Sequence, residues 1–87
     1  MKIKFYKQFV KHLTQRVKPN PSLLKKCDER IALFIKNPKD PLLKDHKLIG
    51  RKEDFRAFSI TGDIRIIYRQ GEDYIYFIDI GSHNQVY

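Results

Sequence analysis

The sequence has one cysteine and three histidines. A single cysteine cannot form a disulfide within the chain, and so few cysteines and histidines cannot supply the clusters that hold structural zinc. No apolar run approaches the roughly 20 residues that a membrane-spanning helix needs. The charged and aromatic start MKIKFY is unlike a secretory signal. These absences predict a reduced, cytoplasmic protein with no metal, no cofactor and no membrane partner.

Acidic residues are missing from the first third of the chain. Residues 1–27 hold eight Lys or Arg and no Asp or Glu, whereas residues 28–87 hold ten residues of each sign. The whole formal net charge of +8 therefore comes from the first 27 residues. A field of this sign favours a polyanion, most often nucleic acid. A solvated lysine-rich face and an acidic protein partner are the alternatives.

The length of 87 residues allows one domain, and a composition of 41% hydrophobic and 32% charged residues is that of a globular chain. We expect residues 1–87 to form this domain. Helical spacing of apolar residues predicts a first helix over about residues 6–18. Asn20 as N-cap and Pro21 at the first helical position predict a second helix, which ends at Asn37-Pro38. Their tight connection predicts an antiparallel hairpin. Cys27 lies on the buried stripe of the second helix and is expected in the core.

Strands are expected on both sides of this pair of helices. Alternation over residues 3–5 predicts a short strand, and residues 39–54 are expected to be irregular. Three further strands are predicted at 55–60, 64–69 and 74–80, joined by glycine-containing turns typical of antiparallel hairpins. The order β-α-α-β-β-β predicts an α+β fold, an antiparallel sheet with the helix hairpin on one face. The other face is then left for function.

Four residues could carry chemistry. Arg65 lies inside an apolar strand, on the face opposite Ile64; such a charge is usually solvated, but a guanidinium there is also a good phosphate clamp. Asp63 ends the preceding turn, where turn chemistry alone also explains an aspartate. His46 lies in the irregular segment and His83 follows the last strand, positions where a lone histidine more often has no role.

Taken together, these residues are suited to cleaving RNA without a metal. The reaction needs a base for the 2′-hydroxyl, an acid for the leaving 5′-oxygen and a cation beside the phosphate. Histidine suits both proton transfers because its pKa lies near neutrality. Arginine stabilises the charge of the transition state, and the C-terminal Tyr87 offers a ring on which a base can stack.

The sequence also resembles a known family over nearly its whole length. The stretches that carry the resemblance are 43–50 (LKDHKLIG), 55–56 (FR), 62–68 (GDIRIIY) and 79–87 (DIGSHNQVY). They resemble the RelE/ParE toxin superfamily, closest to its YafQ-like mRNA interferases, whose fold has the same order of elements. The resemblance implies the toxin of a type II toxin–antitoxin system. Such a toxin enters the ribosomal A site, cleaves mRNA without a metal and so inhibits translation, and it has a cognate antitoxin.

The resemblance implies a role for each candidate. His83 matches the general acid, His46 a base or orienting group, and Asp63 a catalytic acidic residue. Arg65 matches the arginine on the scissile phosphate, and Tyr87 the aromatic that stacks on the substrate base. Further residues expected to bind RNA are Arg56, Lys47, Lys7, Lys11 and Lys18.

One position departs from the family pattern. Some YafQ-like members have a further active-site histidine where this chain has Ser59. The identity of the general base therefore stays open. Two non-nuclease readings also remain: a ParE-like toxin that binds DNA gyrase, and a degenerate toxin-fold protein that only binds RNA or a partner. Two histidines and an aspartate at the matching positions favour the nuclease.

Overall fold

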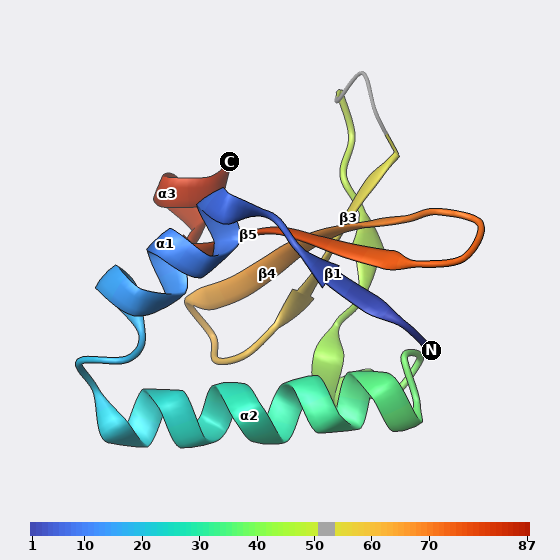
Figure 1. Cartoon of the computed structure of the whole chain (residues 1–87). Coiled ribbons are helices and arrows are strands. Elements are labelled where there is room, and N and C mark those ends of the chain that lie inside the picture. The colour runs from blue at the N-terminus through green and yellow to red at the C-terminus, as the bar shows by residue number, and fades with distance from the viewer. Residues whose placement is uncertain (51–53) are drawn as a thin grey trace.

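A computed structural model describes residues 1–50 and 54–87. Five strands form one sheet in the order β1-β5-β4-β3-β2 (Figure 1). Their bounds are β1 Ile3–Phe5, β2 His46–Lys47, β3 Phe55–Ser59, β4 Ile64–Gln70 and β5 Ile75–Ser82. The predicted antiparallel meander is confirmed for β3, β4 and β5, and β2 adds to it in the same sense. β1 instead pairs with β5 in parallel, so the sheet is mixed.

Two longer helices and two short ones complete the fold. They are α1 Lys7–Arg16, α2 Pro21–Lys36, the 3₁₀ helix η1 Pro41–Leu43 and α3 His83–Val86. The predicted start of α2 is confirmed: the side-chain oxygen of Asn20 accepts a hydrogen bond from the Leu23 N–H at 3.2 Å. Figure 1 shows α2 running along one side of the sheet and α1 beside β5. In the described part of the chain, no helix is both long and apolar enough to cross a membrane.

The main core lies between these helices and one face of the sheet. Phe34 of α2 stacks on Phe58 of β3 with ring centroids 4.4 Å apart, and meets Phe77 of β5 edge-on at 5.9 Å. Phe9 of α1 packs against Phe77 at 5.4 Å. Such aromatic pairs add roughly 0.5–1.5 kcal/mol each beyond the apolar area that they bury. Cys27 is fully buried in this core, as predicted.

The opposite face of the sheet is less open than expected. It carries a second, smaller apolar cluster around Leu48, Ala57 and Ile67, onto which α3 places Val86. The segment expected to be irregular contains η1 and β2, and the residues after β5 form α3 instead of a loop. η1, β2 and α3 have only two to four residues each and no clear periodic pattern, which is why the sequence did not predict them. Together, β2 and α3 bring His46 and the C-terminus to this face.

Candidate active site

Tyr87 contacts three of the predicted site residues. Its hydroxyl lies 3.5 Å from His46 Nε2, and its ring stands edge-on to the ring of His83 with centroids 4.5 Å apart. The guanidinium carbon of Arg65 lies over the same ring, 5.3 Å from its centroid. These residues come from β2, β4 and α3, so the fold gathers segments that are far apart in the sequence. The predicted grouping of both histidines, the arginine and the C-terminal tyrosine is thus present.

Arg65 lies in the middle of the sheet, where it pairs with Ser59 of β3 and Gly81 of β5. Its Nη2 donates to the backbone carbonyl of Gly62 at 3.4 Å. Its Nε is buried and makes no hydrogen bond within the described residues. A buried donor without an acceptor is costly, and a guanidinium binds phosphate oxygens through several donors at once. The geometry around Arg65 therefore suits an anionic group placed beside Tyr87.

His46 is held by the backbone of its own segment. Its Nδ1 lies 3.0 Å from the carbonyl oxygen of Lys44, which only accepts hydrogen bonds, so the proton of the neutral ring is on Nδ1. Lys44 itself adopts the left-handed conformation, with φ of 48°. The other ring nitrogen, Nε2, is left without a proton and faces Tyr87. An imidazole oriented in this way can accept a proton at Nε2.

A pocket of about 450 Å³ opens beside these residues. His46, Lys47, Leu48, Ile49 and Tyr87 line it. Ile49 is 98% exposed, which leaves a large apolar side chain in water at the mouth of the pocket. Apolar and aromatic walls with a few polar groups are typical of small-ligand sites, and a nucleobase has matching flat faces.

A network of polar side chains holds the residue next to His46. The carboxylate of Asp45 accepts hydrogen bonds from the Tyr68 hydroxyl at 2.6 Å and from Arg56 Nη2 at 2.9 Å. Burial and the hydrogen bond to Asp45 raise the pKa of Tyr68 well above its ordinary value, although Arg56 acts in the opposite direction. The hydrogen bond to Asp45 likewise raises the pKa of Arg56. The network fixes the chain one residue before His46, and sequence reasoning did not find it.

This network also removes one expected residue from the site. Arg56 was expected to bind RNA, but its guanidinium pairs with Asp45 and Tyr68, a residue of the main core under the helices. Alternation along β3 and β4 puts Arg56 and Tyr68 on the face opposite Arg65. We therefore leave Arg56 out of the proposed site.

The other expected residues lie at the surface. The carboxylate of Asp63, in the turn before β4, forms no ion pair or hydrogen bond within the described residues, and its backbone N–H donates to Thr61 Oγ1 at 3.2 Å. Lys47 pairs with Asp54 at 3.0 Å, with both side chains well exposed. Three exposed lysines belong to α1 and the turn that follows it: Lys7, Lys11 and Lys18. The roles expected for all of these residues remain predictions.

The strand end that leads to His83 is clamped by α1. Arg16 Nη1 donates to the carbonyl of Ile80 at 2.9 Å. A Cβ atom built at Gly81 would lie 2.6 Å from Arg16 Nη1 and 2.7 Å from Gln85 Oε1, so a larger residue here would displace the ends of these two side chains. The Gln85 side chain also accepts from the Ser82 N–H at 2.8 Å, which starts α3 at His83.

A buried carboxylate anchors the same helix. Asp79 is 7% exposed, and its Oδ2 accepts from Gln8 Nε2 at 2.9 Å. Its Oδ1 pairs with His12 Nδ1 at 2.5 Å and lies 3.8 Å from Arg16. The sequence pattern had not singled out these three residues of α1. Their role is to bind the helix to β5 just before the site.

Comparison with known proteins agrees with the geometry. Residues 1–87 match the family model described as the bacterial toxin of a type II toxin–antitoxin system, YafQ. A putative toxin YafQ from Haemophilus influenzae is 32% identical over 92 residues, covering 98% of this chain and 90% of that protein.

Solved structures share the fold. YafQ in the E. coli DinJ–YafQ complex is similar with a TM-score of 0.81 and 23% identity, covering 98% of this chain and 96% of that chain. A metal-bound toxin from Helicobacter pylori is similar with a TM-score of 0.77 and 30% identity, covering 100% and 99%. The RelE-like α+β fold is thereby confirmed. The chain belongs to the YafQ family and is the toxin of a type II toxin–antitoxin system.

Proposed function

We propose that this toxin is an endoribonuclease that cleaves mRNA in the ribosomal A site and so stops translation in the cytoplasm. The observation that carries the proposal is the contact of Tyr87 with His46, His83 and Arg65. A base, an acid and a fixed cation around one ring are the groups that cleavage of a phosphodiester through its own 2′-hydroxyl requires.

The proposed reaction has two proton transfers and one displacement at phosphorus. His46 Nε2 takes the proton of the 2′-hydroxyl, and the 2′-oxygen forms a bond to the phosphorus. The bond from phosphorus to the 5′-oxygen breaks, and protonated His83 gives its proton to that oxygen. The products are a 2′,3′-cyclic phosphate and a 5′-hydroxyl, so the atoms balance without water.

Arg65 and Tyr87 act on the parts of the substrate that do not exchange protons. The guanidinium of Arg65, which lies over the Tyr87 ring, supplies positive charge to the phosphate oxygens, where negative charge grows in the transition state. The ring of Tyr87 borders the pocket and supports a base beside the scissile bond. Asp63, in the turn two residues before Arg65, keeps the catalytic role that the resemblance implies.

No step of this reaction is assigned to a metal ion. The described residues contain no group of three or more His, Cys, Asp or Glu side chains placed to hold one. The two histidines and the arginine supply the proton transfers and the charge stabilisation by themselves.

A cognate antitoxin is the second partner that we propose. E. coli YafQ has been solved in complex with DinJ, and the net charge of +8 on this chain favours an acidic partner. We expect a segment rich in Asp and Glu to fold across the basic surface and to cover Arg65. Co-expression with the neighbouring gene product should relieve toxicity and yield a stable complex; failure of both would contradict this part.

The test of the enzyme activity is single-turnover cleavage of mRNA on programmed ribosomes, with the cut positions read by primer extension. His83→Ala should lower the cleavage rate by about 10²–10⁴-fold, the usual contribution of a positioned proton donor. Arg65→Ala should lower it by about 10²–10³-fold through lost charge stabilisation. His46→Ala and Asp63→Ala should also impair cleavage. Lys25→Gln, an exposed change on α2, is the matched control.

Full cleavage by folded His83→Ala and Arg65→Ala proteins would contradict the nuclease. If the wild-type chain left mRNA intact but inhibited DNA gyrase supercoiling, the chain would be a ParE-like binder instead. Circular dichroism and thermal unfolding of each variant separate a loss of chemistry from a loss of fold.

A further inference from the structure

A second pocket, also of about 450 Å³, lies where α2 and η1 meet the turn between β3 and β4. Three basic side chains line it: Lys26 and Arg30 from α2, and Lys44 from the segment after η1. The other lining residues are Pro41, Leu42, Ser59, Ile60, Thr61 and Gly62. None of the residues that line the pocket is acidic. The pocket thus concentrates positive charge away from residues 1–18.

Two positive charges on α2 repel one another, and a bound anion would relieve this repulsion. Lys26 and Arg30 are four residues apart, so they lie one above the other on the same face of the helix. Like charges at this spacing destabilise a helix. Neither residue, nor Lys44, forms an ion pair with a carboxylate in the described part of the chain. Three cations therefore share one pocket without a counter-charge.

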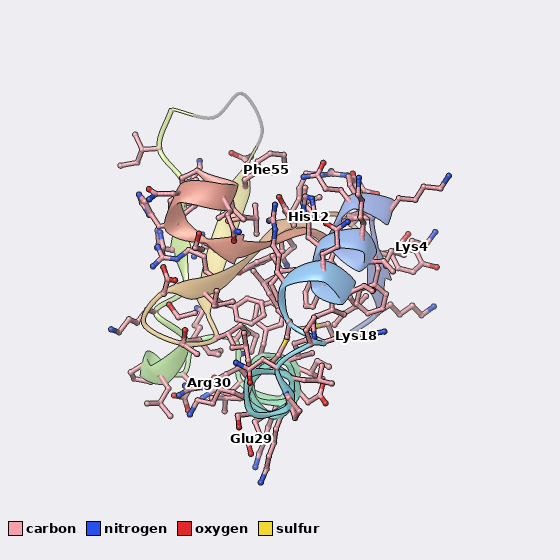
Figure 2. All side chains as sticks on the ribbon, turned by 90° about the vertical axis from the view of Figure 1, so that its left-hand side faces the viewer. Lys4, His12, Lys18, Glu29, Arg30 and Phe55 are labelled. Carbon is pink, nitrogen blue, oxygen red and sulfur yellow. The ribbon has the colours of Figure 1, made fainter. Side chains whose placement is uncertain are left out.

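The acidic residues nearby do not supply that charge. Arg30 points from α2 toward η1, whereas Glu29 points away from the sheet (Figure 2). Asp40 comes directly before η1, but its Oδ1 caps that helix by accepting from the Leu42 N–H at 2.9 Å. Arg30 Nη1 donates to the Leu42 carbonyl at 3.3 Å, which holds the guanidinium at the pocket wall.

A neutral donor completes the lining. The Gly62 N–H makes no hydrogen bond within the described residues, so it is available to an acceptor. A Cβ atom built at Gly62 would meet nothing within 4 Å, so the backbone of this turn faces open space. Cationic side chains together with a backbone N–H donor are what a phosphate group binds.

Two backbone carbonyls connect this pocket to the candidate active site. The carbonyl of Lys44 holds His46 Nδ1, and the carbonyl of Gly62 holds Arg65 Nη2. Ser59, on the pocket wall, is also the register partner of Arg65. Two of the residues that line the pocket, Lys44 and Gly62, thus orient two of the proposed catalytic side chains.

We propose that this basic pocket binds a phosphate group of the RNA strand next to the phosphate that is cleaved. The choice of RNA rests on the proposed function. If the scissile phosphate of an RNA strand lies beside Arg65, the adjacent phosphates of the same strand lie near the residues that surround Arg65, and the pocket is formed by some of these residues. The pocket then fixes the register of the strand, while His46, His83 and Arg65 carry out the cleavage.

The first experiment measures binding, so that it does not depend on cleavage. The full-length toxin, labelled with ¹⁵N, is titrated with inorganic phosphate and with a 2′-O-methyl RNA trinucleotide, which cannot be cleaved because it has no free 2′-hydroxyl. We expect both ligands to shift the amide resonances of Lys26, Arg30, Lys44 and Gly62. A response to inorganic phosphate without a response to the trinucleotide would overturn the assignment to RNA.

A pair of matched double variants tests which charges matter. Lys26→Gln with Arg30→Gln removes two charges that line the pocket, and Lys25→Gln with Lys36→Gln removes two exposed charges from the same helix. The pocket variant should bind the trinucleotide about tenfold more weakly, with the slope of log affinity against log salt smaller by about 1.4, two contacts at about 0.7 each. The control should change both quantities much less. Equal losses in the two variants would overturn the proposal.

The ribosome assay then separates this pocket from the catalytic residues. The pocket variant should need about tenfold more toxin for half-maximal cleavage, while its rate at saturation stays within about twofold of wild type. Arg30→Lys keeps the positive charge and should therefore keep most of the wild-type affinity. A purely structural role of the guanidinium would not predict this result. If wild-type toxin fails to cleave mRNA while the trinucleotide still binds in the pocket, the cleavage proposal fails and the phosphate site stands. Binding of a hexaglutamate peptide in the pocket, without binding of the trinucleotide, would overturn the assignment to an RNA phosphate in favour of an acidic protein partner.

Discussion

The rings of His83 and Tyr87 stand nearly perpendicular to one another, at an angle of 88°, with their centroids 4.5 Å apart. One turn of α3 separates the two residues, so their spacing of four along the chain becomes a direct contact. The Tyr87 N–H donates to the His83 carbonyl at 3.0 Å, which fixes the end of this turn. Through Tyr87, the proposed acid His83 is linked to Arg65 and His46, which come from strands of the sheet.

The ring of Tyr87 should matter more than its hydroxyl. Tyr87→Phe keeps the contacts with His83 and Arg65 and loses only the long contact with His46 Nε2, so single-turnover cleavage should fall less than about threefold. Tyr87→Leu removes the stacking surface, which is worth roughly 1–3 kcal/mol per base, so cleavage should fall about 10- to 100-fold. Equal rates for the two variants would show that the ring does not support the substrate.

The Asp45 network should set the stability of the segment that carries His46. Asp45→Asn replaces the carboxylate that Tyr68 and Arg56 share, and should lower the free energy of unfolding by about 1–3 kcal/mol in urea. If the proposed function is right, Asp45→Asn should also lower the cleavage rate, because His46 would be misplaced. Asp73→Asn, at an exposed turn, is the control. Unchanged stability of Asp45→Asn would contradict a structural role of the network.

The same network predicts an alkaline limit. Burial and the bond to Asp45 raise the pKa of Tyr68 above its unfolded value of roughly 10, so the folded state favours the neutral phenol. Its contribution is therefore full below pH 10 and is lost as the pH rises above that value. The free energy of unfolding should fall above about pH 10, and Tyr68→Phe should reduce that fall. Identical pH profiles for the two proteins would contradict this assignment.

The lysines of α1 should contribute to the salt dependence of ribosome binding. If Lys7, Lys11 and Lys18 each meet a phosphate, changing all three to Gln should reduce the slope of log affinity against log salt by about 2–3. The control is a triple variant that removes the same amount of charge from exposed positions elsewhere, with Gln in place of Lys25, Lys36 and Lys39. An unchanged slope in the α1 variant would remove this face from the binding surface.

Cleavage should not depend on a transition metal. Toxin treated with EDTA and then returned by desalting to ribosome buffer should cleave at the untreated rate, because the proposed proton transfers use His46 and His83 alone. The comparison matters because the similar H. pylori toxin was solved with a metal bound. Loss of activity that zinc or copper restores would contradict a metal-independent mechanism.

Cys27 should be inert in the folded protein. It is fully buried, and burial, with a smaller contribution from Asp28, raises the pKa of its thiol to about 11. Because the thiolate is the reactive form, its reaction with a disulfide reagent at pH 8 should be about 100-fold or more slower than in guanidinium chloride. A fast reaction of the native protein would show that this part of the core opens readily.

Local patterns in the sequence were sufficient for the longer elements and for part of the site. Helical spacing, Asn20 and Pro21 predicted α1 and α2, and alternation with glycine turns predicted β3, β4 and β5. These features depend on residues close together in the chain, so they can be read without knowing what packs against them. The motifs around His46, Arg65 and His83 likewise indicated the toxin family that the comparisons confirm.

The rest was decided by contacts between distant segments. The sequence could not show that β1 would pair in parallel with β5, or that Arg56 would form an ion pair with Asp45. Nor could it show that one pocket would be lined by Lys26, Arg30 and Lys44. Each of these depends on which elements lie side by side after the core has formed, and a periodic pattern carries no information about that. The sequence alone determined the elements and the chemical groups available to this toxin. Only the tertiary structure decided which charges meet a partner in the protein and which are left for a ligand. A buried or crowded charge needs a counter-charge, and folding determines whether a distant segment places one beside it.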